Sequence, residues 1–244
     1  MRVAVLSDIH GNYWALSSVL EDISRRKPDL IVNLGDSLYG PLKPNETYQL
    51  IRSYNILSVS GNQDRAILEN LTDRTKHFTM NYVVDSLCND AIEWLRALPQ
   101  VLELDGDICA FHGTPNSDKT YLLEDLKDGY RQVNAEGIVE TYLTGVKASV
   151  ILCGHSHTCR QVQTSKRLII NPGSVGLQAY DDELPIYHKM ESHNNMAQYC
   201  MLDIANGVQQ VAQISVKYPF EKAVSCAKSN NRLDWAKWLE FGHL

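Results

Sequence analysis

Five short apolar segments of this chain each end beside a glycine and a side chain that can bind metal, and this pattern most constrains the fold. The segments cover residues 2–7, 30–34, 56–59, 108–111 and 150–153. Short runs that are rich in β-branched residues and bounded by turn residues are typical of buried strands. Apolar residues at helical spacing over 12–26 and 45–54 separate the first three runs. The order strand, helix, strand, helix, strand predicts parallel strands with helical crossovers, and hence an α/β fold.

The rest of the sequence predicts further strands and helices without a domain boundary. Strand pairs are expected at 101–104 with 108–111, at 161–164 with 168–170, and at 197–204 with 208–216. We expect a helical insert at about 65–98 that could cap the site, more helix over 118–145, and a C-terminal helix at about 219–240. Neither a repeat nor a Gly/Ser-rich linker divides the chain, so residues 1–244 are predicted to form a single domain.

Polar side chains follow the predicted strands at their carboxyl ends, where open parallel sheets bind ligands. They are Asp8, His10, Asp36, Asn62, His112, His155 and His157. These seven side chains can supply two metal ions with four ligands each if one carboxylate bridges, and Asp36, alone on a middle strand, is the natural bridge. Imidazole mixed with carboxylate favours Zn, Mn, Fe or Ni over Ca. Because residues i and i+2 of a strand share a face, Asp8 with His10 and His155 with His157 are each expected to form a two-pronged clamp.

Each of these residues, taken singly, also has a structural interpretation. Asp8 could cap the following helix, Asp36 could be a turn residue, and a lone histidine is often exposed or hydrogen-bonded in a core. Capping does not explain why seven such side chains all stand at strand ends beside glycines. The combination therefore predicts a dinuclear metal site.

Five motifs, in order, carry a resemblance to a known family. They are DIH (8–10), GD (35–36), GNQD (61–64), HG (112–113) and GHSH (154–157). With these motifs the chain resembles the calcineurin-like metallophosphoesterases from residue 1 to about 176, and SDIHGN and INPGS (170–174) are similar to the small bacterial and archaeal phosphodiesterase-like branch. Protein Ser/Thr phosphatases carry an arginine-bearing motif after GD, where this chain reads GDSLYG, so that subgroup is disfavoured.

The resemblance implies a fold of two stacked mixed β-sheets flanked by helices, a four-layer sandwich. It places Asp8, His10, Asp36 and His157 on one metal ion, and Asp36, Asn62, His112 and His155 on the other. Two divalent transition metal ions (Mn, Fe, Zn or Ni) are implied, with Mn²⁺ expected to support activity in vitro. A hydroxide bridging the two metals would attack phosphorus in line, with Asp36, Asn62 and Asp64 as catalytic positions.

The chain departs from the family at Gln63, where many members carry a histidine that protonates the leaving oxygen. Glutamine donates a hydrogen bond but no proton, so either another residue is the acid or the leaving group departs easily. His77, in the helical insert, is the best substitute acid that the sequence offers. Asp64, which would ordinarily orient that histidine, would here brace its loop or bond to Asn62 or a water.

Substrate contacts are expected from Asn12, Arg65 and Asn171, with turn chemistry for the asparagines and a solvated or structural arginine as the alternatives. Substrate choice should lie in the insert and in the tail from about 177 onward, where aromatic residues such as Tyr180 could stack a base. Trp94, Trp235 and Trp238 have the helical spacing of core residues; the last two could also form a dimer contact, which leaves a homo-oligomer open.

The expected function is that of a phosphodiesterase acting on a small phosphate ester, with nucleotides among the candidates. A phosphomonoesterase, a dinucleoside polyphosphate hydrolase and a catalytically silent metal-binding scaffold protein are the alternatives. The net charge of −6 argues against an extended nucleic-acid-binding face. No apolar run reaches the roughly 18 residues that span a bilayer, and no signal peptide is recognisable. Six scattered cysteines without a C-x-x-C pair indicate reduced thiols in a cytoplasmic protein.

Overall fold

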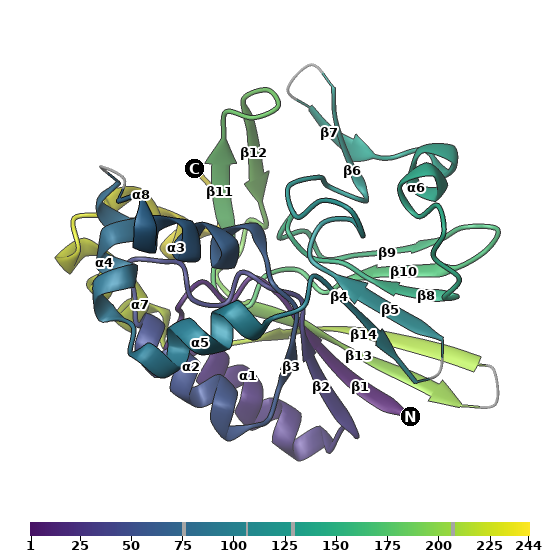
Figure 1. Cartoon of the computed structure of the whole chain (residues 1–244), viewed down its shortest axis with the longest axis horizontal. Coiled ribbons are helices and arrows are strands. Elements are labelled where there is room, and N and C mark those ends of the chain that lie inside the picture. Colours follow the sequence, from purple (N-terminus) through teal and green to yellow (C-terminus); the bar gives the residue numbers. More distant parts are fainter. Residues whose placement is uncertain (75–76, 106, 128–129, 206–207) are drawn as a thin grey trace.

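A computed structural model of the chain describes residues 1–74, 77–105, 107–127, 130–205 and 208–244, and shows two mixed five-stranded sheets packed face to face (Figure 1). The first sheet has the strand order β14 (Val208–Val216), β13 (Ala197–Ala205), β1 (Arg2–Leu6), β2 (Leu30–Asn33) and β3 (Leu57–Ser58). The second has the order β4 (Val101–Leu104), β5 (Ile108–Phe111), β8 (Val150–Leu152), β10 (Leu168–Asn171) and β9 (Arg160–Gln163). In the first sheet β1, β2 and β3 run parallel, β13 is antiparallel to β1, and β14 is antiparallel to β13. In the second sheet the central strands β5, β8 and β10 run parallel, and the edge strands β4 and β9 run antiparallel to them.

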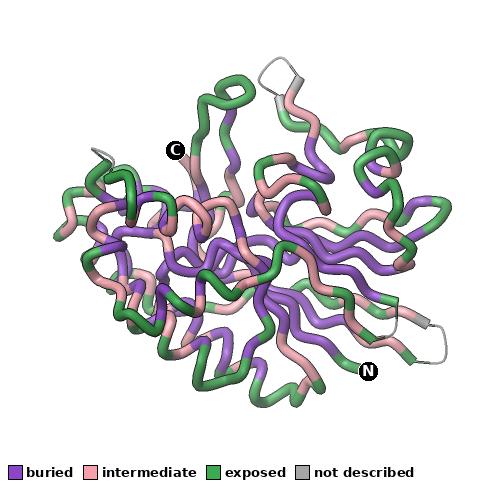
Figure 2. Tube along the Cα trace, in the orientation of Figure 1, coloured by how far each residue is buried: buried purple, intermediate pink, exposed green. Residues whose placement is uncertain are grey.

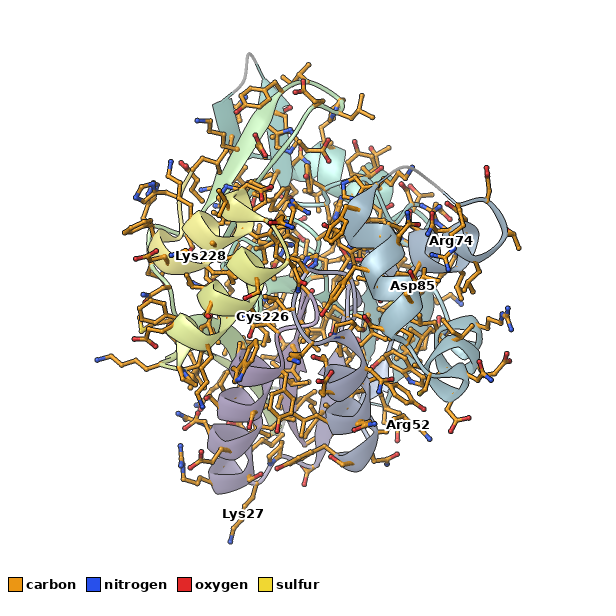
Figure 3. The ribbon with its side chains drawn as sticks, turned by 90° about the vertical axis from the view of Figure 1, so that its left-hand side faces the viewer. Lys27, Arg52, Arg74, Asp85, Cys226 and Lys228 are labelled. Atoms are coloured by element: carbon orange, nitrogen blue, oxygen red, sulfur yellow. The ribbon has the colours of Figure 1, made fainter. Side chains whose placement is uncertain are left out.

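Helices cover the outer faces of both sheets. In the described part of the chain they are α1 (Tyr13–Arg26), α2 (Pro44–Ser53), α3 (Asn62–Thr72), α4 (Phe78–Ser86), α5 (Asn89–Ala97), α6 (Glu136–Tyr142), α7 (Phe220–Ser229) and α8 (Leu233–Phe241). Helix α1 begins at Asn12, whose side chain accepts a hydrogen bond from the Ala15 amide, and ends at Lys27 in the left-handed conformation. Its apolar stripe faces the first sheet, while charged side chains such as Lys27 and Arg52 stand on the outside of the helical layer (Figure 3).

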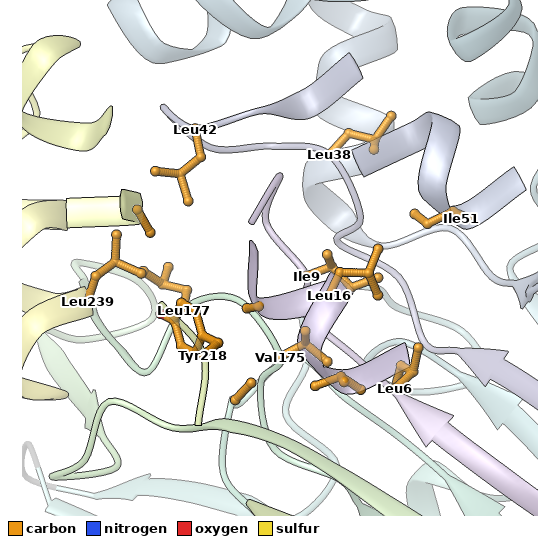
Figure 4. Packing of buried hydrophobic residues seen from close by; sticks show 14 of the residues in the cluster. Leu6, Ile9, Leu16, Leu38, Leu42, Ile51, Val175, Leu177, Tyr218 and Leu239 are labelled. Carbon is orange, nitrogen blue, oxygen red and sulfur yellow. The ribbon is translucent and has the colours of Figure 1, made fainter. Parts of the chain in front are cut away.

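Three apolar clusters separate the layers and confirm the expected sandwich. One lies between the first sheet and the helices, with Leu6, Leu16 and Ile51 among its members (Figure 4). The second fills the space between the two sheets, and the third joins the outer face of the second sheet to α6. The strands at the centre of the molecule are accordingly buried along most of their length (Figure 2).

Two hairpins project from the same end of the molecule (Figure 1), and the sequence pattern missed both. They are β6 (Glu124–Lys127) with β7 (Tyr130–Val133), and β11 (Ala179–Asp182) with β12 (His188–Glu191). The prediction of helix over 118–145 is wrong except for α6. Residues 128–129 lie outside the described residues, but their Asp-Gly sequence is a strong hairpin signal that outweighs the weak helical pattern around it.

The closing helix and the insert need smaller corrections. The single helix expected at about 219–240 is two helices, because Asn231 adopts a left-handed conformation (φ 56°) and the side chain of Asn230 donates a hydrogen bond to the Pro41 carbonyl. The insert at 65–98 is helical as expected. Trp235 and Trp238 are buried, as their spacing predicted.

No disulfide joins the six cysteines; Cys109, Cys153 and Cys200 are buried, whereas Cys88 and Cys159 are exposed. In the described part of the chain, every helix is too short or too polar to cross a membrane.

The layer between the sheets gives a test of stability. Ile170 is fully buried there, so Ile170→Ala is expected to lower the free energy of unfolding by about 2–5 kcal/mol, measured by urea denaturation. Ile138→Ala on α6, where the side chain is 48% exposed, is the matched control and should change it by less than about 1 kcal/mol. Equal losses in the two variants would contradict the packing described here.

Candidate metal centre

Loops that follow β1, β2, β5 and β8, together with the first turn of α3, bring the seven predicted side chains to one edge of both sheets. Backbone hydrogen bonds join these loops: the Asp8 amide donates to the Gly35 carbonyl (3.0 Å), and the Gly154 amide donates to the His112 carbonyl (2.7 Å). The His155 amide donates to the Asp8 carboxylate (3.1 Å), which links the first sheet to the second. The site therefore lies on the seam between the sheets.

Five of the seven side chains leave a backbone in the left-handed region, which residues other than glycine rarely adopt. The φ angles are 55° for Asp8, 53° for His10, 53° for Asp36, 68° for His155 and 51° for His157. Such conformations each cost roughly 1–3 kcal/mol and are found where function needs them. The strands end before these residues, so strand alternation does not apply to them. The clamp that alternation predicted for His155 with His157 does not form, because the two side chains join different groups, as the family resemblance implied.

Two of the neighbouring glycines are needed because other atoms lie too close for a side chain, and not because their φ angle is unusual. A Cβ on Gly61 would lie 2.2 Å from Asp36 Oδ1, and a Cβ on Gly154 would lie 2.0 Å from Ser7 Oγ. Gly61 itself has an ordinary φ of −94°. The turns can close around the site because these two residues lack a side chain.

The side chains form two groups, each compact enough to hold an ion. Asp8, His10 and His157 make the first group, and Asp36, His112 and His155 make the second. In the first, His10 Nε2 lies 3.1 Å from His157 Nε2, and His157 Nε2 lies 3.3 Å from Asp8 Oδ1. In the second, His112 Nε2 lies 3.5 Å from Asp36 Oδ2 and 3.0 Å from Asn62 Oδ1. Asp36 Oδ2 is also 4.0 Å from His10 Nε2, so this carboxylate stands between the groups.

Backbone carbonyls fix the protonation of three imidazoles. The Nδ1 atom of His10 faces the Tyr39 carbonyl at 2.9 Å, that of His112 faces the Leu34 carbonyl at 2.8 Å, and that of His157 faces the Leu177 carbonyl at 2.7 Å. A carbonyl only accepts, so each neutral ring carries its proton on Nδ1. Each Nε2 therefore presents a lone pair to the centre of the site.

Lone pairs thus approach one another without a proton between them. This holds for His10 with His157, and the buried Asp8 Oδ1 has no hydrogen-bond partner. Buried acceptors left in this state are costly, and a cation placed among them offsets the repulsion. Neutral imidazole Nε2 and carboxylate oxygens are the donors that divalent transition metals use, so the residues fit such ions.

Burial shapes the ionisation of the group. It lowers the pKa of both His10 and His155 to about 3, which keeps these rings in the neutral form that binds metal. Burial also raises the pKa of Asp8, but His157 and its other histidine neighbours outweigh it and hold that pKa below the usual value. The pKa of Asp36 rises to about 7 through burial, with Asp64 and Asp8 adding to the rise.

Asp64 and Arg65 bond to other groups of the protein and do not join the two groups of potential metal ligands. The Asp64 carboxylate accepts hydrogen bonds from the Ser37 amide (3.0 Å) and the Gly61 amide (3.1 Å), which ties two of the ligand-bearing loops together. Arg65 Nε donates to Asp118 at 2.7 Å, and its guanidinium also pairs with Glu69. We therefore interpret Asp64 as a positioning residue rather than a catalytic one, in line with the expected brace, and Arg65 as the structural arginine of the two alternatives.

The two asparagines predicted to contact substrate are also structural. Asn12 caps α1 and donates to the Gly176 carbonyl at 2.9 Å. Asn171 donates to the Gly154 carbonyl (2.8 Å) and to Ser156 Oγ (3.1 Å), which shapes the loop that carries His155 and His157. Both side chains are buried with their hydrogen bonds made inside the protein, so the alternative of turn chemistry holds.

A cavity of about 170 Å³ opens onto both groups. Gln63 lines it, together with Tyr39, Arg232 and Trp235. No described residue between 65 and 98 lines it, so the described part of the insert does not form a wall of this cavity. His77 caps α4 through the Met80 amide and borders a neighbouring cavity that shares Tyr39 and Gln63 with this one, with its ring centroid 6.4 Å from that of Tyr39.

Three residues that the motifs did not single out hold the histidine rings. Tyr121 stacks on His155 (ring centroids 4.5 Å apart, planes at 26°), and Tyr180 packs edge-on against His157 at 4.5 Å. The Tyr121 hydroxyl bonds to that of Tyr180 at 2.8 Å and to His188 Nε2 at 2.9 Å. Tyr180 and His188 come from the hairpin of β11 and β12, which has no sequence motif to reveal it.

Comparison with known proteins agrees with the family resemblance of the five motifs. Residues 1–204 match the family model of the calcineurin-like phosphoesterase superfamily domain. An uncharacterized protein of Methanocaldococcus jannaschii is 29% identical over 257 residues, covering 96% of this chain and 94% of its own.

Two solved structures share the fold over nearly their whole length. The metallophosphoesterase of Sphaerobacter thermophilus is 24% identical with a TM-score of 0.74, over 97% of this chain and 99% of its own. A hypothetical protein of Pyrococcus horikoshii is 21% identical with a TM-score of 0.77, over 99% of this chain and 98% of its own.

The raised pKa of Asp36, about 7 against an ordinary 3.8, predicts a pH-dependent stability in the absence of metal. Between pH 3.8 and pH 7 the native protein keeps a proton on Asp36 that the unfolded chain has lost. The free energy of unfolding therefore falls as the pH rises through about 7. Asp36→Asn removes this effect. From pH 5 to pH 8 the variant should gain about 2–3 kcal/mol in free energy of unfolding relative to wild type, measured with urea. Asp90→Asn, on the surface, is the control; a difference that does not vary with pH would contradict the assignment.

Proposed function

Because the chain belongs to the calcineurin-like phosphoesterase superfamily, we propose that it is a metal-dependent phosphodiesterase with a dinuclear centre. The observation that carries the proposal is the convergence of imidazole and carboxylate donors in two adjacent groups, with Asp36 between them. The first ion would be held by Asp8, His10, His157 and Asp36. The second would be held by Asp36, Asn62, His112 and His155.

Divalent cations in such a site supply a Lewis acid for the phosphoryl group and lower the pKa of water. The donor set suits Mn, Fe, Zn or Ni, and we propose Mn²⁺ for activity in vitro. The protein contributes orientation: Tyr121 and Tyr180 fix two of the histidine rings, and the carbonyls on Nδ1 keep three Nε2 atoms directed inward.

Gln63 lines the cavity in a position where its side chain can donate a hydrogen bond but no proton. The substrate would therefore carry a good leaving group, such as a phenolate or a nucleotide, unless a solvent molecule supplies the proton. A phosphomonoesterase and a dinucleoside polyphosphate hydrolase remain the enzymatic alternatives. A silent scaffold protein is disfavoured because all seven donors are present and converge.

Metal reconstitution tests the proposal. The protein is stripped of metal, reloaded with Mn²⁺, and assayed with bis-p-nitrophenyl phosphate beside p-nitrophenyl phosphate, while bound metal is counted by elemental analysis. We expect two ions for each chain and hydrolysis of the diester in preference to the monoester. Asp36→Ala should lose the activity, since it removes the shared carboxylate. Two bound ions without turnover of either ester would overturn the enzymatic proposal.

A second prediction concerns the missing acid. Gln63→His restores a proton donor at the cavity wall, so hydrolysis of diesters with alkyl leaving groups should rise by about tenfold or more. Hydrolysis of bis-p-nitrophenyl phosphate should change little, because a phenolate leaves without a proton. Gln63→Asn, which also lacks an acid, is the control. An equal change for both leaving groups would show that position 63 acts on binding and not on proton transfer.

A further inference from the structure

The candidate metal centre lies where two cavities meet. Besides the cavity of about 170 Å³, a larger one of about 600 Å³ adjoins the site, and the two share Asn62, His155 and Asp182. The larger cavity is bounded by residues of β6 and of the turn between β11 and β12, the two hairpins that project from one end of the molecule (Figure 1). Its volume is within the range of about 300–1,000 Å³ typical of small-molecule sites. We call it the hairpin cavity.

We propose that the hairpin cavity binds an uncharged, nucleoside-sized substituent of a phosphodiester that carries a single negative charge. This rests on the proposed phosphodiesterase function and names the substrate class of the same site. The phosphoryl group would lie at Asn62 and His155, where the cavities join, and one ester substituent would extend between the hairpins.

The wall of the hairpin cavity supports an apolar or aromatic substituent. Leu126, Tyr142, Leu184 and Pro185 line it. Tyr142 is 37% exposed and Leu184 is 74% exposed, so both side chains leave apolar surface that a ligand can cover. A bound planar group would cover both, and stacking of a base on an aromatic side chain is favourable.

The charges around the centre oppose a substrate with several phosphates. Asp125 and Asp182 line the hairpin cavity, and Asp181 lines the smaller one. Two arginines are already paired with carboxylates: Arg232, which lines the smaller cavity, with Asp234, and Arg160 with Glu124. Among the described residues that line the hairpin cavity, Lys119 is the only lysine or arginine. A polyphosphate chain would bring several negative charges to these carboxylates with one cation to offset them.

The test of size uses two diesters with the same charge and the same leaving group, thymidine 5′-(p-nitrophenyl phosphate) and methyl p-nitrophenyl phosphate. We expect the Mn²⁺-loaded enzyme to favour the nucleoside ester in kcat/KM. Tyr142→Ala should lower kcat/KM for the nucleoside ester by about fivefold or more relative to that for the methyl ester. Tyr54→Ala, at a tyrosine that is 40% exposed and outside both cavities, is the matched control.

Calorimetric titration of the methylphosphonate ester of thymidine, also singly charged, gives a readout independent of turnover. Its affinity should fall in Tyr142→Ala and not in Tyr54→Ala. If both diesters are hydrolysed and Tyr142→Ala leaves the preference and the affinity intact, the inference is overturned while the phosphodiesterase function stands. If the enzyme with two bound ions hydrolyses neither diester, the proposed function fails and the inference fails with it.

The test of charge compares the nucleoside diester with diadenosine tetraphosphate. We expect the diester to be the better substrate. Asp125→Asn and Asp182→Asn should each raise the relative kcat/KM for the tetraphosphate by about two- to fivefold, whereas Asp90→Asn, which removes a charge away from both cavities, should not. In Asp182→Asn, the new side-chain carbonyl can still accept the hydrogen bond that the Asp182 carboxylate takes from the Leu184 amide (2.9 Å). A wild-type preference for the tetraphosphate would overturn the inference.

Discussion

The repulsion among buried, unprotonated acceptors is the constraint on which the rest of the structure depends. The Nε2 atoms of His10 and His157 and the Asp8 carboxylate converge without protons between them, beside the carboxylate of Asp36. Left alone, such a cluster destabilises the fold, because each group has lost its water and gained no donor. The surrounding protein must hold these side chains together against that repulsion until a cation is bound.

The scaffold does this through buried hydrogen bonds. Asp64 ties the loop after β2 to the start of α3, Asn171 shapes the loop after β8, and Asn12 anchors the start of α1. Ile9, between two of the acceptors, is fully buried in the apolar cluster with Leu16 and fixes the loop from behind (Figure 4). The left-handed backbone at five of the acceptors persists because the sheets and these contacts over-determine it.

Residues of both hairpins line the larger cavity, and the hairpin of β11 and β12 also contacts histidines of the candidate metal centre. Tyr180 and His188 of β11 and β12 brace the histidine rings through Tyr121, and the same hairpin closes the larger cavity. Two residues that orient the site, Tyr180 and His188, therefore lie on the same hairpin as Leu184 and Pro185, which line the larger cavity. A change in that hairpin is expected to affect geometry and specificity together, which is why exposed positions such as Tyr142 separate the two better.

The sequence patterns determined the α/β class, the parallel strands of the first 64 residues and all seven convergent side chains, because strand and helix periodicity and turn motifs are local properties. The sandwich of two stacked sheets was implied by the family resemblance and not by these patterns. The sequence did not assign the roles of Asn12, Arg65 and Asn171, since a polar residue near a motif can face the substrate or the backbone equally well. It also missed both hairpins, and strand alternation by itself did not show that His155 and His157 join different groups. Those outcomes depend on contacts between segments far apart in the chain, such as Tyr121 with Tyr180 and Asp8 with His155, and only the tertiary structure decides them.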